Sequence, residues 1–342
     1  MKHFTCILLF LLLGVSAPAQ EKGKGNEPKA QAESPGFVAA KKAYAAGKYK
    51  EAIRLLEAEL ATEKKKAKPD ENRVGIILSG LATSYNSIGL VHDNKGEYDK
   101  ALEYYQKSLA IRLKQLGPEH PSVATSYNNI GFVHYEKGEY DKALEYYQKS
   151  LAIYLKQLGP EHPHVATSYG IISKILALAS KPDFVKAHEY NKKAEAIYRE
   201  KEGDNSSGMS SVYYCRGIIY YAQEDFPEAK ESLLKALDFI ESTPKPEPLM
   251  VARRHHELGR TEKALGDIKK AREHLEKALE IRQGNLPDSH PDIKKTKTEL
   301  DKLPKKDKKN AFLRYDIRLL NRPNRRPPEP IAEWPGVYQC QL

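Results

Sequence analysis

The stretch "GEYDKALEYYQKSLAI" spans Gly96–Ile111 and returns unchanged at Gly138–Ile153. The two copies begin 42 residues apart. Self-similarity at a fixed period of roughly 20–50 residues is the signature of a stacked-repeat architecture. The repeated stretch therefore predicts one helical unit, used several times along the chain.

An alanine within this stretch gives a frame for the whole chain. Its counterparts lie 42 to 49 residues apart, at Ala52, Ala101, Ala143, Ala187, Ala229 and Ala271. Twelve residues before most of them is a small residue: Ala40, Gly89, Gly131, Gly217 or Gly259. We expect two helices per copy, joined by a glycine turn. We also expect Gly131 to face Ala143 at the crossing, because a large side chain would push the axes beyond about 8–10 Å.

Three stretches carry a resemblance to a known family: "YNNIG" (127–131), the repeated sixteen residues and "LGPEHPHVA" (158–166). The chain resembles the tetratricopeptide repeat (TPR) proteins over residues 37–303, in the 42-residue form of kinesin light chains. The resemblance implies an all-α fold, a right-handed α-solenoid of about six helix pairs. It also implies a concave groove lined by first helices that binds a peptide or protein, without chemistry.

The expected organisation has four parts. A signal peptide (1–19) and a flexible leader (20–36) precede the array, and a disordered or extended basic, proline-rich tail (304–342) follows it. Within the array, repeats are expected near 37–60, 82–121, 124–163, 166–201, 210–242 and 249–290, with a capping helix at 292–303. Residues 61–72 are expected to form a charged extension or loop.

The N-terminus has the pattern of an export signal. The apolar run "FTCILLFLLLGV" has 12 residues and is followed by Ala17 and Ala19, which suit signal peptidase. This run is shorter than the roughly 20 residues that span a bilayer as a helix. We therefore expect a secreted or periplasmic protein, the alternative being an uncleaved signal anchor.

The sequence shows no enzyme motif: no P-loop, no strand-anchored GxGxxG, no HExxH and no GxSxG. His120, His162 and His290 occupy equivalent connectors before a proline, so repetition explains them better than a metal site. His255 and His256 are adjacent, and adjacent helical residues point about 100° apart, so they cannot easily share an ion. We expect no catalytic residue, no cofactor and no metal.

Charge raises two further alternatives. A pI of 9.1 and 21 tyrosines fit a nucleic-acid binder, but Tyr104–Tyr105 and Tyr146–Tyr147 belong to second helices, so we expect no nucleic acid. The tail carries nine Lys and Arg against four acids. The second functional hypothesis is thus an envelope-associated spacer whose tail makes peripheral contact with an anionic polymer or membrane.

Copies two and three differ at six of 42 positions, and four of the six lie on the first helix. Residues three and four apart share a helix face. By the family resemblance this face lines the groove. The candidate groove residues are Asn86, Leu90, Asp93, Asn128, Asn129, Phe132, Tyr135, Tyr214, Ile218, Tyr221, Arg253, His256, Arg260 and Lys263. The basic residues of the last copy suggest a ligand with an acidic end. The alternative is that exposed positions simply drift after duplication.

The signal sequence yields a first prediction. Exported protein should begin at Gln20, because Ala17 and Ala19 place the cleavage site there. Intact-mass spectrometry of secreted or periplasmic material checks this. A mass that retains Met1 would show an uncleaved anchor instead.

Overall fold

The computed structural model describes residues 33–203 and 206–304. These residues form thirteen helices and no strand. The described residues fall into two compact units, divided after Gln157, which we treat separately. The expected signal peptide, most of the leader and nearly all of the tail lie outside the described residues. The all-α prediction is confirmed.

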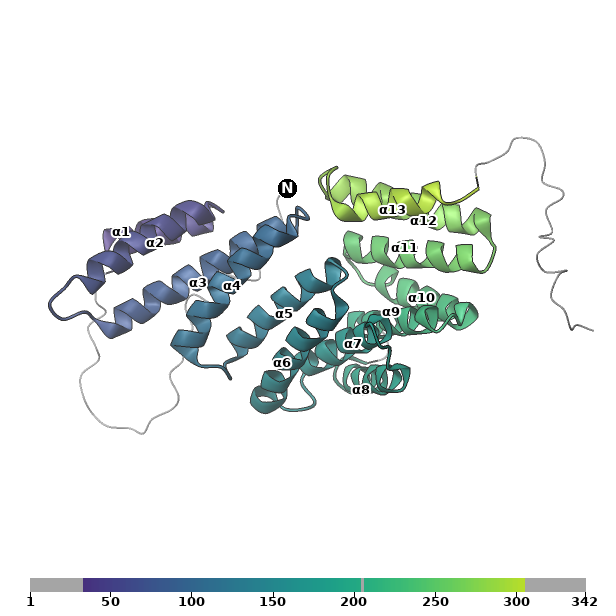
Figure 1. Ribbon diagram of the computed structural model, residues 1–342, viewed down its shortest axis with the longest axis horizontal. Helices are drawn as coiled ribbons and strands as arrows, with labels where there is room; N and C mark the ends of the chain where they lie inside the picture. Colours follow the sequence, from purple (N-terminus) through teal and green to yellow (C-terminus); the bar gives the residue numbers. More distant parts are fainter. Residues whose placement is uncertain (1–32, 204–205, 305–342) are drawn as a thin grey trace, which may run out of the picture. The chain divides into compact units, whose positions relative to one another are not determined.

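The helices come in pairs joined by short turns (Figure 1). The first unit holds α1 (Pro35–Ala45), α2 (Tyr49–Lys64), α3 (Glu71–Asp93), α4 (Tyr98–Leu116), α5 (Pro121–Glu136) and α6 (Tyr140–Leu158). The second holds α7 (Pro163–Leu178), α8 (Phe184–Glu202), α9 (Ser207–Ala222), α10 (Phe226–Glu241), α11 (Pro248–Ala264), α12 (Ile268–Asn285) and α13 (Pro291–Asp301). Odd-numbered helices up to α11 are first helices, and their even-numbered partners are second helices.

Close helix crossings hold each pair together. All six frame alanines are 0% exposed. A Cβ atom on Gly259 would lie 2.5 Å from Leu275 Cγ and 3.0 Å from the carbonyl oxygen of Ala271. The expectation that Gly131 faces Ala143 is wrong in detail, because the nearest atom to a Cβ there belongs to Tyr147, at 3.0 Å. The small residue makes room for the large side chain four positions after the alanine.

The turn between the two helices of a pair requires a residue in the left-handed backbone conformation, with positive φ. Gly96 and Gly138 have φ of 72° and 77°, which glycine adopts without a steric penalty. At the equivalent position of the α9–α10 pair stands Glu224, with φ of 62°. This pair therefore keeps the turn geometry with a residue that is strained in it.

The histidine–proline connectors have a structural role that the sequence pattern alone did not reveal. His120, His162 and His290 are the N-cap residues of α5, α7 and α13. In each, Nδ1 accepts a hydrogen bond of 3.1 Å from the backbone N–H two residues on. The proline that follows occupies the first helical turn, where a backbone N–H is not needed.

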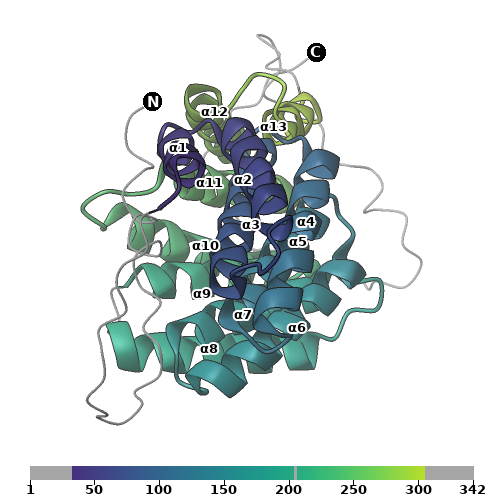
Figure 2. The ribbon, with the colours of Figure 1, turned by 90° about the vertical axis from the view of Figure 1, so that its left-hand side faces the viewer.

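The first connection differs from expectation. Only residues 65–70 leave the helices, and α3 begins at Glu71, earlier than the expected repeat boundary at 82. The added turns bury Val74 and Ile77. Figure 2 shows α1, α2 and α3 toward the viewer. By length and composition alone α3 could cross a membrane, but Ile77, Leu81 and Ile88 pack in a core with residues of α2 and α4.

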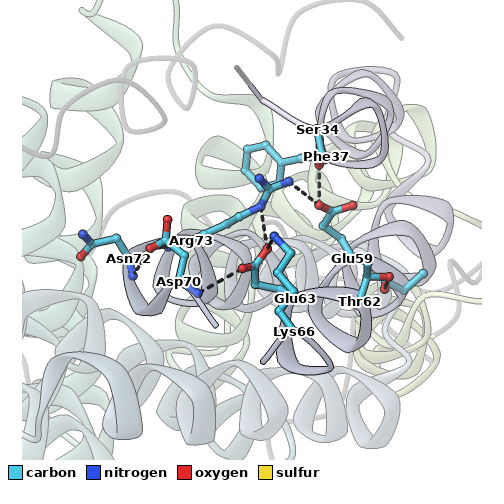
Figure 3. A network of polar contacts seen from close by, with 10 residues as sticks. Ser34, Phe37, Glu59, Thr62, Glu63, Lys66, Asp70, Asn72 and Arg73 are labelled. Carbon is cyan, nitrogen blue, oxygen red and sulfur yellow. Dashed lines mark hydrogen bonds and ion pairs between the residues drawn. The ribbon is translucent and has the colours of Figure 1, made fainter. Parts of the chain in front are cut away.

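A polar network fixes this connection (Figure 3). Glu63, only 1% exposed, accepts hydrogen bonds from Lys66 Nζ at 2.7 Å and from the backbone N–H of Asp70 at 3.1 Å. Arg73 reaches both Glu63 (Nε–Oε2 3.1 Å) and Glu59 (Nη2–Oε1 2.6 Å). These contacts hold the pKa of Glu63 below its usual value, the Lys66 hydrogen bond most of all. The charged segment is thus a folded joint between α2 and α3.

The array ends in a covered core. Leu300 and Leu303 pack against Ala271 and Leu275 of α12. The side of α13 turned away from this core carries exposed lysines, such as Lys294 and Lys295. A polar outer face on the last helix is what a stacked array needs to stay soluble.

The crossings yield a prediction with an internal control. Gly259→Ala should destabilise the protein by about 1–3 kcal/mol, because the new methyl overlaps Leu275 and a backbone carbonyl. Gly284→Ala, in α12, meets no atom within 4 Å and should stabilise it by about 0.5–1 kcal/mol. Urea unfolding followed by far-UV circular dichroism measures both. Equal effects of the two substitutions would contradict the crossing geometry.

Candidate functional site

The candidate groove residues form a regular stripe. Twelve of them stand 15, 11 and 8 positions before a frame alanine, so three share one face of each of the four first helices α3, α5, α9 and α11. We call this the first-helix stripe. Its members are Asn86, Leu90 and Asp93 of α3, Asn128, Phe132 and Tyr135 of α5, Tyr214, Ile218 and Tyr221 of α9, and His256, Arg260 and Lys263 of α11. Asn129 and Arg253 flank it.

The stripe is open at some positions and closed at others. Leu90 is 50% exposed. Phe132, Tyr135, Tyr214 and Tyr221 are half-buried. Members that are buried in the protein itself are Asp93, Ile218 and His256. The surface available to a ligand is therefore narrower than the sequence pattern predicts.

Asparagine amides link the first helices of the first unit. Asn129 Nδ2 donates to Asn86 Oδ1 at 2.8 Å, across one repeat. Asn128 Oδ1 is buried and has no hydrogen-bond partner in the part of the chain that the structure describes. The side-chain amide of Asn129 is thus already hydrogen-bonded, whereas the side-chain oxygen of Asn128 accepts no hydrogen bond from the described residues.

Packing between helices explains two of the six differences between the near-identical copies. Ser87, the counterpart of Asn129, lies 3.0 Å (Oγ) from the Tyr44 hydroxyl of α1. Each residue thus matches the first helix that precedes it. Arg112, the counterpart of Tyr154, donates from Nη1 to the Ser122 carbonyl at 3.0 Å and to Ser126 Oγ at 2.8 Å.

The arginine contact recurs at the end of the array. Arg282 stands eleven positions after its frame alanine, as Arg112 does. Its Nη1 donates to the Asp292 carbonyl at 3.1 Å and to Thr296 Oγ1. Sequence reasoning missed this helix-to-helix contact, although the shared frame position and the hydroxyl residues ahead could have signalled it.

The second unit brings cations and tyrosine rings together along the stripe. The Arg254 guanidinium lies 4.8 Å from the ring centroid of Tyr214. Arg260 lies 4.5 Å from the centroid of Tyr221, whose ring also meets Phe226 at 5.4 Å. Such cation–π contacts hold the rings in fixed positions.

Most of the positive charge expected on α11 is already neutralised. Arg260 Nη1 lies 2.7 Å from Glu257 Oε2, and Lys263 Nζ lies 3.3 Å from Glu299 Oε2. The Glu257 charge raises the pKa of Arg260. Burial alone would raise the pKa of Glu257, but Arg260 and its cationic neighbours lower it. Arg260 and Lys263 therefore form ion pairs with carboxylates of the protein itself.

His256 contributes no positive charge at neutral pH. Its Nδ1 lies 3.3 Å from both Arg282 Nη1 and Thr296 Oγ1. Burial, aided by Arg282 and Arg260, lowers its pKa to about 4. His256 packs α11 against α12 and α13, so the reason for assigning it to an acidic ligand end fails.

Arg254, which the sequence analysis did not select, is the unusual cation. It is only 2% exposed, and its hydrogen bonds go to neutral oxygens, the Met250 carbonyl (3.1 Å) and Ser210 Oγ (3.2 Å). Its Nε has no partner among the described residues. Burial lowers the pKa of this guanidinium.

The adjacent histidines of α11 point to different neighbours, as helix geometry requires. His255 meets His274 of α12, with Nδ1 atoms 2.9 Å apart, while His256 meets Arg282. In the described ranges no three His, Cys, Asp or Glu side chains gather as a metal site would require. Cys215 is buried, and burial raises the pKa of its thiol, so it is not an activated nucleophile.

Comparison with known proteins agrees with this architecture. The tetratricopeptide repeat model matches residues 80–156, 122–200 and 208–284. Among solved structures, the chain is similar to a Rap protein complexed with Competence and Sporulation Factor (TM-score 0.51, 14% identity, 72% of this chain and 75% of that chain). It is also similar to the apo form of RapI (0.50, 19%, 78% and 87%).

A third similar structure has repeats like those of kinesin light chains. It is the putative kinesin light chain of Podosopora anserina with nearly identical TPR-like repeats (TM-score 0.30, 22% identity, 72% of this chain and 93% of that chain). At these identities the solved structures show the fold alone. The family model matches more than half of the chain, and the protein therefore belongs to the tetratricopeptide repeat family.

Proposed function

We propose that this protein is an exported, non-catalytic scaffold that binds a peptide or protein on the first-helix stripe of its first unit, formed by α3 and α5. The observation that carries the proposal is the accessible apolar surface on the first helices of the first unit, formed by Leu90 of α3 and by Phe132 and Tyr135 of α5.

These apolar members of the stripe supply the contact. Leu90 is 50% exposed on α3, and Phe132 and Tyr135 are half-buried on α5. Lone exposed leucines are common, but this one shares its frame position with Phe132 of the next copy. An apolar ligand side chain placed there would gain roughly 25 cal/mol for each Å² it buries.

In the second unit, considered by itself, an acidic ligand group would pair with a residue other than the predicted Arg260, Lys263 and His256. Arg260 and Lys263 are paired, and His256 is neutral. Arg254, in contrast, is buried on α11, and its hydrogen bonds go only to neutral groups. A ligand carboxylate near Tyr214 would complete the pairing that a buried charge requires.

Export and the alternative function depend on the ends of the chain. The proposed secreted or periplasmic location rests on the N-terminal apolar run and the residues Ala17 and Ala19. In the alternative, an envelope-associated spacer, the excess of Lys and Arg in residues 304–342 holds the protein to an anionic polymer or membrane. A spacer needs no binding stripe, so the two hypotheses predict different results.

A selection with a matched control tests the proposal. The full chain is used to select from a random peptide library displayed on phage, and the selected peptides are measured by fluorescence anisotropy. Leu90→Glu should weaken their binding at least tenfold, because burying a leucine side chain is worth about 1.5–3 kcal/mol. Leu234→Glu, on a second helix at 42% exposure, should leave binding unchanged.

Circular dichroism confirms that both variants fold. Equal binding by both variants would refute the stripe as the site. Failure to select any peptide, together with salt-sensitive binding to heparin that is lost on truncation after Pro304, would favour the spacer.

A further inference from the structure

A pair of aromatic rings recurs between the two helices of successive pairs. The first-helix ring stacks on or tilts against the second-helix ring, and a lysine on the second helix lies over both. Centroid distances are 6.2 Å for Tyr85–Tyr104, 6.1 Å for Tyr127–Tyr146 and 5.2 Å for Tyr169–Tyr190, under Lys107, Lys149 and Lys193 respectively. We call this feature the aromatic pair.

In the last helix pair, histidines take the place of both tyrosines. His255 and His274 occupy the positions of Tyr127 and Tyr146 relative to the frame alanine, and Lys277 occupies that of Lys149. The imidazole centroids are 5.1 Å apart. A contact between rings that do not titrate near neutral pH has become a contact between rings that do.

The two imidazoles share a single hydrogen. Their Nδ1 atoms lie 2.9 Å apart, so one must donate and the other accept. A first added proton can go to the other nitrogen of the donor ring and leave this bond in place. A second added proton must go to the accepting Nδ1, and two N–H groups then oppose each other at this distance. The contact cannot survive double protonation.

The groups facing the pair come from three helices. Lys277 and Glu273 belong to α12, Glu262 to α11, and Glu241 and Lys230 to α10. Glu241 Oε1 is 3.8 Å from His255 Nε2 and 3.7 Å from Lys277 Nζ, so its charge is shared. Burial and then Lys277 lower the pKa of His255 to about 4, and burial lowers that of His274. The surroundings therefore oppose protonation of the folded pair.

We propose that the α11–α12 helix pair is an acid-sensitive element: uptake of protons by His255 and His274 separates these helices while the tyrosine-bearing pairs stay closed. Opening would displace α11, which carries Arg254 and the end of the first-helix stripe. Loss of ligand binding on acidification is the functional consequence, which rests on the proposed function. The opening of the helix pair does not depend on that function.

The direction of the effect follows from proton binding. Exposed imidazoles titrate near 6.5, whereas the folded pair titrates lower. The opened state therefore binds more protons as the pH falls below about 6.5, and stability present above that pH is lost toward about 4. Each histidine kept neutral by folding makes opening up to about tenfold more favourable per pH unit. His256, also neutral in the folded state, adds a third proton.

Hydrogen exchange of the full chain measures the opening. With amide exchange corrected for intrinsic rates, α11 and α12 should lose protection by at least tenfold between pH 7 and pH 5, and α3 and α4 should not. The double variant His255→Tyr, His274→Tyr restores the aromatic pair of the other repeats. Its opening should depend on at most one proton, that of His256. Equal pH dependence in the wild type and this variant would overturn the proposal.

A transplant keeps the proposal falsifiable if the tyrosine variant misfolds. Tyr127→His with Tyr146→His, under the lysine already present at Lys149, should give α5 and α6 the same loss of protection at pH 5. NMR titration of labelled histidines in the wild type supplies an independent measure. Values for His255 and His274 near 6.5 would overturn the proposal. None of these readouts uses a ligand, so their failure is distinct from failure of the proposed binding function.

Discussion

The close crossing between the two helices of each pair is the contact on which the rest of this structure depends. The six frame alanines have no exposed surface. In four of the pairs a glycine faces the crossing, and a methyl group added to it would lie 2.5 to 3.0 Å from a large side chain. These glycines are Gly89, Gly131, Gly217 and Gly259. Interiors packed this tightly tolerate little added volume. The aromatic pairs, the arginine contacts and the first-helix stripe all take their positions from axes held at this separation.

Features that repeat could be predicted from the sequence, and features that depend on a particular neighbour could not. The paired helices, their glycine turns and the frame alanines follow from a pattern present in several copies. The early start of α3 depends on Val74 and Ile77 meeting α2, which no other copy reproduces. The network around Glu63 is likewise unique to one joint, and its charges resemble those of a solvated loop when read as sequence.

For the candidate site, periodicity gave the face of each helix but not its chemistry. Asn128 and Asn129 are adjacent and equally polar, yet one bonds to Asn86 and the other has an unused oxygen. Arg260 looks like a free cation until Glu257, off the stripe, is seen to pair with it. Such a partner can lie on the same helix, as Glu257 does, or on a neighbouring one, as Asn86 does, so the residue types along the stripe cannot reveal which polar groups remain available.

Separation of packing from chemistry also explains how one repeat could acquire a property that its neighbours lack. Ala271 and Gly259 keep the last crossing as close as the others, so the fold there does not depend on which rings fill the aromatic pair. Histidine retains the planar shape and adds a proton equilibrium. A solenoid contacts mainly its nearest neighbours, so the stability change stays local to the substituted pair. Among the described helices, only the short α13 follows the α11–α12 pair. Opening this pair would therefore disturb less of the described structure than opening a pair in the middle of the array.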